Sequence, residues 1–248
     1  MRMRLSFVGL TFPVALLVAA PAAAQILTKG DVESGTLAPF ETQGALPDSV
    51  TIVTSPVRAG GHAVRSWLRR SDPLVSKGQR AELIDHTPVP LHEVRWYALS
   101  IWAGDDFTMP VRTDGICFQF HQHARTGSPV LAFRLIGGNW KITTDAAKPR
   151  RTLATQPFAP NRWTDWVIRV KWSGEATGEW TIWKDGQQVV HETNVVTTLA
   201  TETAAPYAKF GQYHTVEDAP QNVLYFDEYR LAGPAADYAD VAPGGVEP

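Results

Sequence analysis

Polar and apolar residues alternate in three short stretches of the chain, residues 79–83, 118–121 and 207–213. Side chains on a β-strand point to opposite faces with a period of two, so each stretch predicts a strand with one polar and one apolar face. We expect the polar faces to form a groove across a sheet, with the residues Arg80, Glu82, Gln119, His121, His123, Tyr207, Lys209 and Tyr213. We expect the apolar faces to pack in the core, with the residues Ala81, Leu83, Phe118, Phe120, Ala208 and Phe210.

Short β-rich runs separated by turn signals cover most of the remaining chain, and none has the period of a long amphipathic helix. This pattern favours a sandwich or a barrel. The predicted strands are 50–54, 62–68, 80–85, 94–102, 115–123, 130–136, 140–144, 163–172, 179–184, 188–191, 207–213 and 223–231. Asp185-Gly186 predicts a hairpin, because both turn positions favour positive φ. Residues 145–160 are predicted to be a connection, whose basic segment 147–151 is either a solvated loop or a lid over an acidic substrate.

The length of 248 residues suits one all-β domain, which we place at residues 25–232. Residues 1–24 combine a basic start, an apolar stretch and small residues before a cleavage point, which predicts a signal peptide and a secreted or periplasmic protein. An uncleaved anchor is the alternative. The segment 233–248 is rich in Ala, Pro, Gly and acid, so we expect it to be disordered.

The net charge of the chain limits the classes of partner that it can bind. The chain has 23 basic and 25 acidic residues, and removal of residues 1–24 takes away two arginines and leaves 21 against 25, a net charge of −4. This balance argues against a nucleic acid or an anionic membrane as partner, and no other stretch is apolar for the roughly 20 residues that a spanning helix needs. An acidic polysaccharide fits if positive charge is focused in a groove. We expect a monomer.

The cysteine and tryptophan content bears on disulfide bonds, the core and sugar binding. The only cysteine, Cys117, excludes an internal disulfide, and its spacing from Gln119 predicts a small, half-buried residue on the groove face rather than a nucleophile. Of the nine tryptophans, we expect several to fill the core and others to stack on sugar rings.

The predicted groove combines groups that bind anions with groups that move protons. Arg80 and Gln119 can bind a carboxylate, whereas His121 and Tyr213 can transfer protons. A uronic acid carries its carboxylate at C5 and a glycosidic oxygen at C4. Neutralising the carboxylate acidifies the C5 proton, so a base can remove this proton while an acid protonates the departing O4. The groove therefore predicts β-elimination.

The three stretches resemble motifs of the jelly-roll polysaccharide lyases, which include alginate lyases, glucuronan lyase and heparin lyase I-like proteins. Those alginate lyases show Arg-x-Glu-Leu, Gln-x-His and Tyr-x-Lys-x-Gly-x-Tyr strands, and this chain has all three in that order at 80–83, 119–121 and 207–213. Lesser resemblances to the glucuronan and heparin lyase I-like branch lie at 30–35, 97–102, 134–140 and 225–228. The resemblance implies a concanavalin-like β-jelly-roll sandwich of two antiparallel sheets with a concave substrate groove.

The resemblance also implies roles. Arg80 and Gln119 would neutralise the carboxylate, Tyr213 would be the acid and also the base in some substrates, and His121 would be the base or a carboxylate partner. Glu82, Tyr207 and Lys209 would line or brace the groove, with His123 and Arg134 as further substrate contacts. Arg134 could instead point to solvent. The implied activity is cleavage of a uronate-containing polysaccharide at the 4-O-glycosidic bond, leaving a 4,5-unsaturated uronate. Phe120 and Phe210 depart from the alginate lyase pattern, so the resemblance specifies the reaction better than the sugar.

The sequence is also compatible with other functions and with a metal site. A non-catalytic carbohydrate-binding module would keep the groove without needing Tyr213, and a jelly-roll hydrolase would need two carboxylates flanking the bond. His121 and His123 could bind a metal as in cupins, although no Glu follows within the next few residues. The proposed chemistry needs no cofactor. Three carboxylates, Asp31, Glu33 and Asp227, could hold a structural calcium ion or serve in turns and salt bridges.

Overall fold

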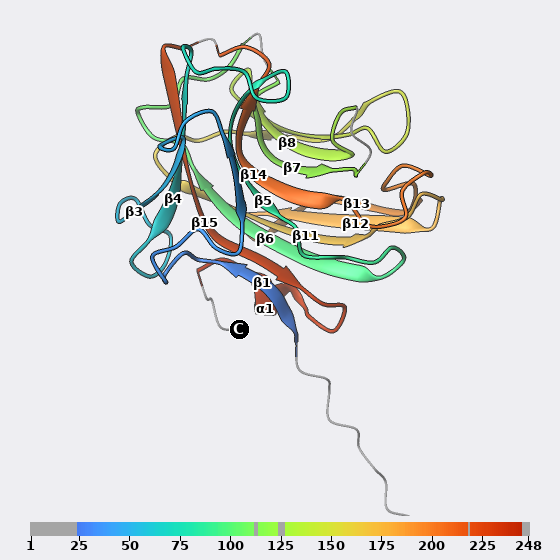
Figure 1. Cartoon of the computed structure of the whole chain (residues 1–248). Coiled ribbons are helices and arrows are strands. Elements are labelled where there is room, and N and C mark those ends of the chain that lie inside the picture. Colours follow the sequence, from blue (N-terminus) through green and yellow to red (C-terminus); the bar gives the residue numbers. More distant parts are fainter. Residues whose placement is uncertain (1–23, 112–113, 124–126, 218, 245–248) are drawn as a thin grey trace, which may run out of the picture.

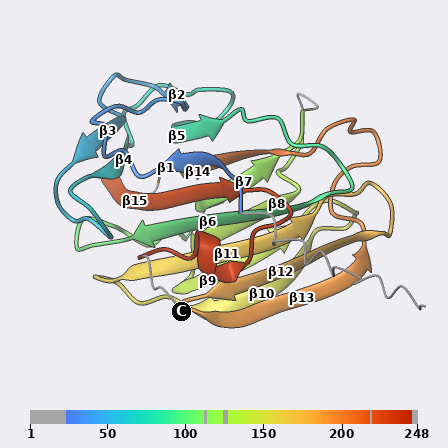
Figure 2. The same cartoon turned by 90° about the horizontal axis from the view of Figure 1, so that it is seen from below.

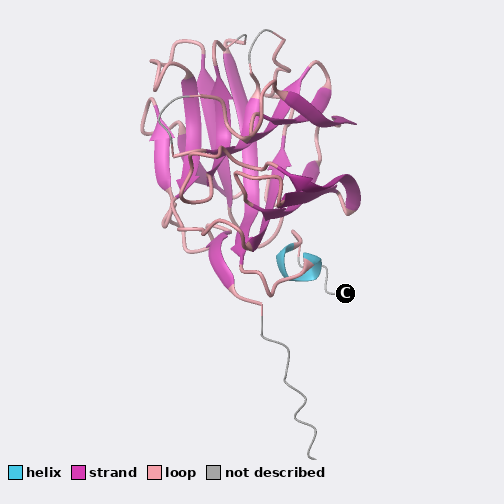
Figure 3. Cartoon of the chain, turned by 90° about the vertical axis from the view of Figure 1, so that its right-hand side faces the viewer, coloured by secondary structure: helices cyan, strands magenta, loops and turns pink. Residues whose placement is uncertain are grey.

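The computed structural model describes residues 24–111, 114–123, 127–217 and 219–244. Within these residues the chain folds into fifteen strands in two antiparallel sheets and one short helix, α1 (Tyr238–Val241), near the C-terminal end (Figures 1 and 3). This architecture confirms the expected all-β sandwich. The predicted signal peptide, apart from Ala24, lies outside the described residues.

One sheet contains eight of the described strands and the other contains seven. The strands of the eight-stranded sheet are β1 (Ile26–Gly30), β3 (Val50–Val53), β4 (Ala63–Arg69), β6 (Val94–Trp102), β11 (Trp163–Lys171), β12 (Gly178–Lys184), β13 (Gln187–Val195) and β15 (Gln221–Ala232). They lie in the order β13-β12-β11-β6-β15-β4-β3, with β1 paired to β15.

The strands of the seven-stranded sheet are β2 (Glu41–Gly44), β5 (Gln79–Asp85), β7 (Ile116–His121), β8 (Leu131–Ile136), β9 (Asn139–Thr144), β10 (Arg151–Pro157) and β14 (Tyr207–His214). They lie in the order β10-β9-β8-β7-β14-β5-β2. The three strands with alternating polar residues, β5, β14 and β7, are therefore direct neighbours near the middle of one sheet.

Aromatic rings from the facing sheets fill the core between them. Phe120 of β7 contacts Tyr97 of the other sheet at a centroid distance of 4.8 Å, and Phe133 of β8 contacts Trp166 at 4.9 Å. Large rings that are removed from water supply much of the stabilisation of such a sandwich. The predicted apolar faces of β5, β7 and β14 point into this core.

The hairpin predicted at Asp185-Gly186 is confirmed, since these residues join β12 to β13 with φ values of +49° and +81°. The connection predicted at 145–160 is wrong in part, because residues 151–157 form the edge strand β10. The edge strands β1 and β2 were not expected either. No helix in the described part of the chain is long and apolar enough to span a membrane.

The segment after residue 232, for which the composition predicted disorder, packs on the sandwich as far as Gly244, the last described residue. Arg230 holds it by donating to the carbonyl groups of Val241 and Ala242 at 3.0 and 2.7 Å. Val241 is fully buried, and α1 lies against the outer face of β6 and β15 (Figure 2). A buried valine and two backbone acceptors therefore fix a segment whose composition alone suggested flexibility.

Candidate active site

The register of β5, β14 and β7 brings the predicted site residues into rows across the sheet. Tyr213 of β14 lies opposite Arg80 of β5. On its other side β14 pairs with β7, where Lys209 lies opposite Gln119. All four side chains share the face that points away from the core, as the alternation predicted.

A single carboxylate links the polar side chains of the three strands. Glu82, which is only 1% exposed, accepts hydrogen bonds from Arg80 Nη1 at 2.8 Å and from Lys209 Nζ at 2.6 Å through Oε2. Its other oxygen, Oε1, accepts from the amide of Gln119. Lys209 also donates to Gln43 Oε1 of β2 at 2.6 Å. Burial lowers the pKa of Lys209, whereas the adjacent carboxylate of Glu82 opposes this effect and favours the ammonium form.

Arg80 and Tyr213 are positioned by each other and by the turn before β5. The guanidinium carbon of Arg80 lies 4.2 Å from the centroid of the Tyr213 ring, and its Nε donates to the carbonyl of Val75 at 2.9 Å. The ring edge of Tyr213 passes so close to Gly78 that a Cβ there would come within 2.2 Å of it. The glycine therefore leaves the space that the ring occupies.

His121 has one ring nitrogen tied to the backbone. Its Nδ1 lies 2.8 Å from the carbonyl oxygen of Gln122, which can only accept, so Nδ1 carries the hydrogen and Nε2 is left as the basic nitrogen of the neutral ring. Burial lowers the pKa of His121, and the positive charges of Lys209 and Arg80 lower it further, although the bond to Gln122 opposes them. Such an imidazole is neutral near pH 7 and can accept a proton.

Arg80, His121, Lys209 and Tyr213 line a cavity of about 570 Å³, which is called the groove below. Its lining residues are Gln43, Ser76, Lys77, Arg80, His121, His123, Gly127, Tyr207, Lys209 and Tyr213. Three of them are cations and, among the described residues, none is a carboxylate, because Glu82 lies beneath the floor. The groove therefore attracts anions.

A smaller cavity of about 90 Å³ adjoins the groove and shares Arg80, His121 and Tyr213 with it. It also contains Gln119 and Arg134. Arg134 is 5% exposed and donates to the Asp114 carboxylate and to Thr143 Oγ1, both at 2.9 Å. Burial lowers the pKa of Arg134. The structure thus places Arg134 under the end of the groove rather than in solvent.

His123 and Tyr207 form the rim of the groove. Tyr207 lies opposite His121 in the β14–β7 pair, and burial raises its pKa. His123 Nε2 lies 3.0 Å from the carbonyl oxygen of Ala205, which holds the imidazole next to the Tyr207 ring at a centroid distance of 5.4 Å. Both side chains line the groove.

A β-bulge in β7 changes the predicted position of Cys117. The pairing of β7 with both neighbours shifts at Ile116, so Ile116 lines the smaller cavity and Cys117 turns into the core. Cys117 is fully buried, and burial raises the pKa of its thiol to about 12. The prediction that Cys117 lies half-buried on the groove face is therefore wrong.

Sterics explain why the third motif has a glycine, Gly211. Gly211 lies opposite Glu82 with a φ of +133°, and a Cβ there would lie 2.1 Å from the carbonyl oxygen of Ala81. Only glycine permits this close approach of β14 to β5.

The three carboxylates considered for calcium do not converge. Glu33 accepts from the backbone of Gly61 and His62, and Asp31 pairs with Lys29. Asp227 accepts from the backbone of Arg58 at 2.7 Å, and burial raises its pKa to about 6. Within the described residues no group of three or more His, Cys, Asp or Glu side chains is placed to hold a metal ion. In the described part of the chain these carboxylates make backbone and ion-pair contacts, the second of the two roles considered for them.

Several groove residues had no signal in the sequence pattern. Gln43 lies on a short edge strand, and Ser76 and Lys77 lie in a turn with positive φ. None of the nine tryptophans, all of which fall in the described ranges, lines the groove. The Ser-Lys-Gly turn directly before the Arg80 strand was the one available clue to Lys77.

Comparison with known proteins gives one matching family model and several solved structures with the same fold. A family model described as polysaccharide lyase matches residues 32–230. A search of curated protein sequences gave no match. An endo-β-1,4-glucuronan lyase from the fungus Trichoderma reesei superposes with a TM-score of 0.70 at 19% identity, covering 89% of this chain and 99% of its own.

Two more distant structures share the fold. The catalytic domain of a glycoside hydrolase family 131 protein from Coprinopsis cinerea has a TM-score of 0.57 at 12% identity, covering 84% of this chain and 94% of its own. An alginate lyase of polysaccharide lyase family 7 has a TM-score of 0.54 at 12% identity, covering 77% of this chain and 93% of its own. Because hydrolases and lyases both use this fold, the chemistry has to be argued from the site.

Proposed function

This chain belongs to the polysaccharide lyase family, and we propose that it cleaves a uronate-containing polysaccharide by β-elimination at the 4-O-glycosidic bond, leaving a 4,5-unsaturated uronate. The observation that carries the proposal is the convergence of Arg80, Gln119 and Lys209 on the buried carboxylate of Glu82. This arrangement holds a carboxylate-binding set rigidly beside two groups that can move protons, His121 and Tyr213.

Arg80 is the principal contact for the substrate carboxylate. A guanidinium has five N–H groups, and three of those of Arg80 bond to Val75, Ser76 and Glu82 in the described part of the chain. The remaining two can face the groove as a charge-assisted pair of donors. Because negative charge grows on the carboxyl oxygens as the C5 proton leaves, these donors stabilise the transition state more than the bound substrate.

His121 Nε2 and the hydroxyl of Tyr213 carry out the two proton transfers. His121 Nε2 accepts the C5 proton, the electron pair left behind forms the C4–C5 double bond, and the C4–O4 bond breaks. Tyr213 gives its proton to the departing O4. No water enters the products, which distinguishes the reaction from hydrolysis.

The stereochemistry of the sugar decides whether His121 is needed. In guluronate and iduronate the C5 hydrogen and O4 lie on opposite faces, so a separate base is required. In glucuronate and mannuronate they lie on the same side, and Tyr213 can remove the C5 proton and return it to O4. His121 then contacts the carboxylate instead.

The charge of the groove supports a uronate as substrate. Lys77, Arg80 and Lys209 line it without a carboxylate among the described lining residues. Glu82 supplies one negative charge to Arg80 and Lys209 from beneath the floor, and a polyuronate supplies one further carboxylate per sugar, which a neutral polysaccharide lacks. We also propose that the enzyme is exported, which the basic and apolar pattern of residues 1–24 supports.

One assay tests the proposal. The mature protein is incubated with glucuronan, polymannuronate, polyguluronate, heparin and hyaluronan, and the ultraviolet absorbance of the unsaturated product is followed. We expect absorbance to rise on at least one polymer. New reducing ends without absorbance would indicate hydrolysis, and retained binding without any cleavage would indicate a non-catalytic module. Either result would refute the proposal.

A further inference from the structure

A second cavity, of about 650 Å³, lies on the opposite side of the sandwich from the groove. It is called the outer cavity below, and its side walls come from Arg58, Arg162, Trp163, Asp165, Asp185 and Tyr238. Side chains alternate along β11. Trp166 packs into the core on Phe133, so Asp165 points to the outer face of the eight-stranded sheet. The volume lies within the range of small-molecule binding sites.

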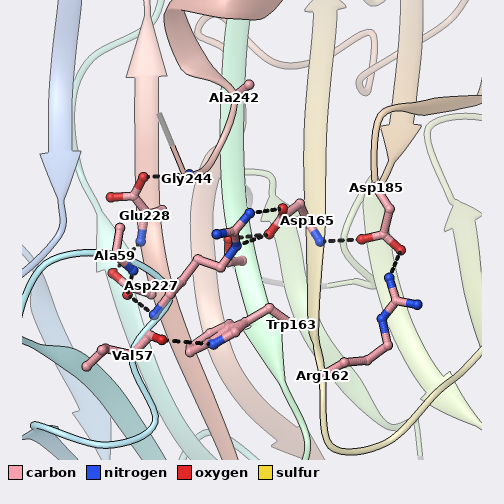
Figure 4. A network of polar contacts seen from close by, with 12 residues as sticks. Val57, Ala59, Arg162, Trp163, Asp165, Asp185, Asp227, Glu228, Ala242 and Gly244 are labelled. Atoms are coloured by element: carbon pink, nitrogen blue, oxygen red, sulfur yellow. Dashed lines mark hydrogen bonds and ion pairs between the residues drawn. The ribbon is translucent and has the colours of Figure 1, made fainter. Parts of the chain in front are cut away.

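The charged residues of the outer cavity form a network in which each side chain is held by its neighbours. Arg58 binds the carboxylate of Asp165 through two bonds of 3.1 and 2.8 Å, and Ser100 donates to the same carboxylate at 2.7 Å. Asp185 accepts from the backbone of Asp165 at 2.9 Å and from Arg162 at 3.2 Å (Figure 4). Fixed polar groups of this kind lose little conformational entropy when a ligand binds.

Two aromatic side chains, Trp163 and Tyr238, form part of the walls. The indole of Trp163 donates to the carbonyl of Val57 at 3.1 Å, which fixes the ring at the mouth of the network (Figure 4). Tyr238 packs on Trp183 at a centroid distance of 5.4 Å. The hydroxyl of Tyr238 lies 3.9 Å from the position of a Cβ at Gly186, and burial together with the nearby carboxylates of Asp165 and Asp185 raises its pKa.

The charges of the outer cavity cancel, unlike those of the groove. Its four charged lining residues are two arginines, Arg58 and Arg162, and two aspartates, Asp165 and Asp185. A uronate would meet as much repulsion as attraction there. The chemistry that fits is a ligand without charge that offers hydroxyl groups to paired Arg and Asp side chains and an apolar face to an aromatic ring.

We propose that the outer cavity is a second, non-catalytic binding site for uncharged sugar residues of a polysaccharide. It accounts for Trp163, which lines this cavity although no tryptophan in the described ranges lines the groove. It also uses the Asp185-Gly186 turn, which faces the hydroxyl of Tyr238. The site does not depend on the reaction carried out in the groove.

Affinity electrophoresis tests this proposal on the mature protein carrying Tyr213→Phe, so that polymers in the gel stay intact. The gels contain mixed-linkage β-glucan, xylan, galactomannan or amylose. We expect at least one of these neutral polymers to slow migration. Arg162→Ala, at an exposed residue, should raise the apparent Kd at least tenfold, as should Trp163→Ala. Arg151→Ala, which removes another exposed and ion-paired arginine, should change nothing.

Three results would overturn the proposal. The first is normal migration in all four neutral polymers. The second is retardation that survives both Arg162→Ala and Trp163→Ala in proteins with unchanged thermal unfolding. The third is loss of retardation on Arg80→Ala, which would place the neutral chain in the groove. Because the readout is binding rather than cleavage, failure here and failure of the lyase assay are separate outcomes.

Discussion

The guanidinium of Arg80 lies against the ring of Tyr213, 4.2 Å from its centroid, across the pair formed by β5 and β14. A cation over a tyrosine ring contributes roughly 0.5–2 kcal/mol, depending on how far water is excluded. The group that binds the substrate carboxylate and the group that moves the proton therefore orient each other. Neither can shift without disturbing the other.

Arg80→Lys keeps the charge but loses this arrangement, because an ammonium cannot stack flat on the ring or offer a forked pair of donors. We expect kcat/KM to fall about 100-fold, as when one donor to a developing oxyanion is removed. Arg169→Lys is the matched control, since Arg169 also lies over an aromatic ring, Trp96, on the other sheet. Steady-state kinetics with the unsaturated product as readout measures both. Equal rates for wild type and Arg80→Lys would contradict the role of Arg80.

Tyr213→Phe removes the proposed acid and leaves the ring on Gly78. Loss of a general acid typically slows a reaction 10²–10⁴-fold, so we expect kcat to drop by about that factor while polymer binding is kept. Tyr225→Phe serves as control, because that hydroxyl bonds to Asp106 away from the groove. A Tyr213→Phe enzyme with full activity would exclude the assigned role.

Glu82→Gln should weaken both the fold and the reaction. The amide offers one accepting oxygen where the carboxylate binds three donors, and it leaves Arg80 and Lys209 without their buried counter-charge. Removing one partner of a buried ion pair costs about 3–5 kcal/mol, measurable by urea unfolding. Glu192→Gln breaks the more exposed pair with Arg151 and should cost no more than about 1 kcal/mol. Similar losses in the two variants would show that Glu82 is not the link described.

The acidic limb of the pH profile should report His121 wherever this residue is the base. The environment lowers the pKa of the imidazole from its ordinary 6.5, and only the neutral ring accepts a proton. Activity should therefore fall as the pH drops, with a midpoint below pH 6.5. His121→Ala should abolish this limb in the residual activity, whereas His191→Ala, on β13, should leave it unchanged. A midpoint above 6.5, or a limb that survives His121→Ala, would argue for another base.

Among the correctly predicted strands, β5, β6 and β14 each lie between two neighbours in a sheet and are largely buried. β6 matches its predicted bounds, Val94–Trp102, and the faces of β5 and β14 are as the alternation indicated. The missed strand β10 is an edge strand with partly exposed residues on both faces, so its pattern resembles that of a loop. An edge strand is stabilised by a neighbour that its own residues do not reveal.

The residues that make up the site could be predicted from the sequence, but the contacts between them could not. Arg80, Gln119, His121 and Tyr213 stand at regular spacing on strands, and the structure brings all four to the smaller cavity that adjoins the groove. The buried position of Glu82 depends on the register of three strands, and the inward turn of Cys117 depends on one extra residue in a bulge. The separation of Asp227 from Glu33 likewise depends on packing between distant segments. Such features arise from pairing across the sheet, which local periodicity does not encode.

The buried carboxylate of Glu82 also bears on how the sheet assembles. It takes one donor each from β5, β7 and β14, and Lys209 extends the chain of contacts to β2. If β14 slipped by one residue during folding, Lys209 would turn toward the core and Glu82 would be left facing an apolar side chain. Glu82 would then keep Arg80 of its own strand but lose the ammonium of Lys209, and a buried charge with fewer partners makes such a misaligned sheet costly. The groups that prepare the groove for its substrate therefore also select the correct strand alignment as the chain folds.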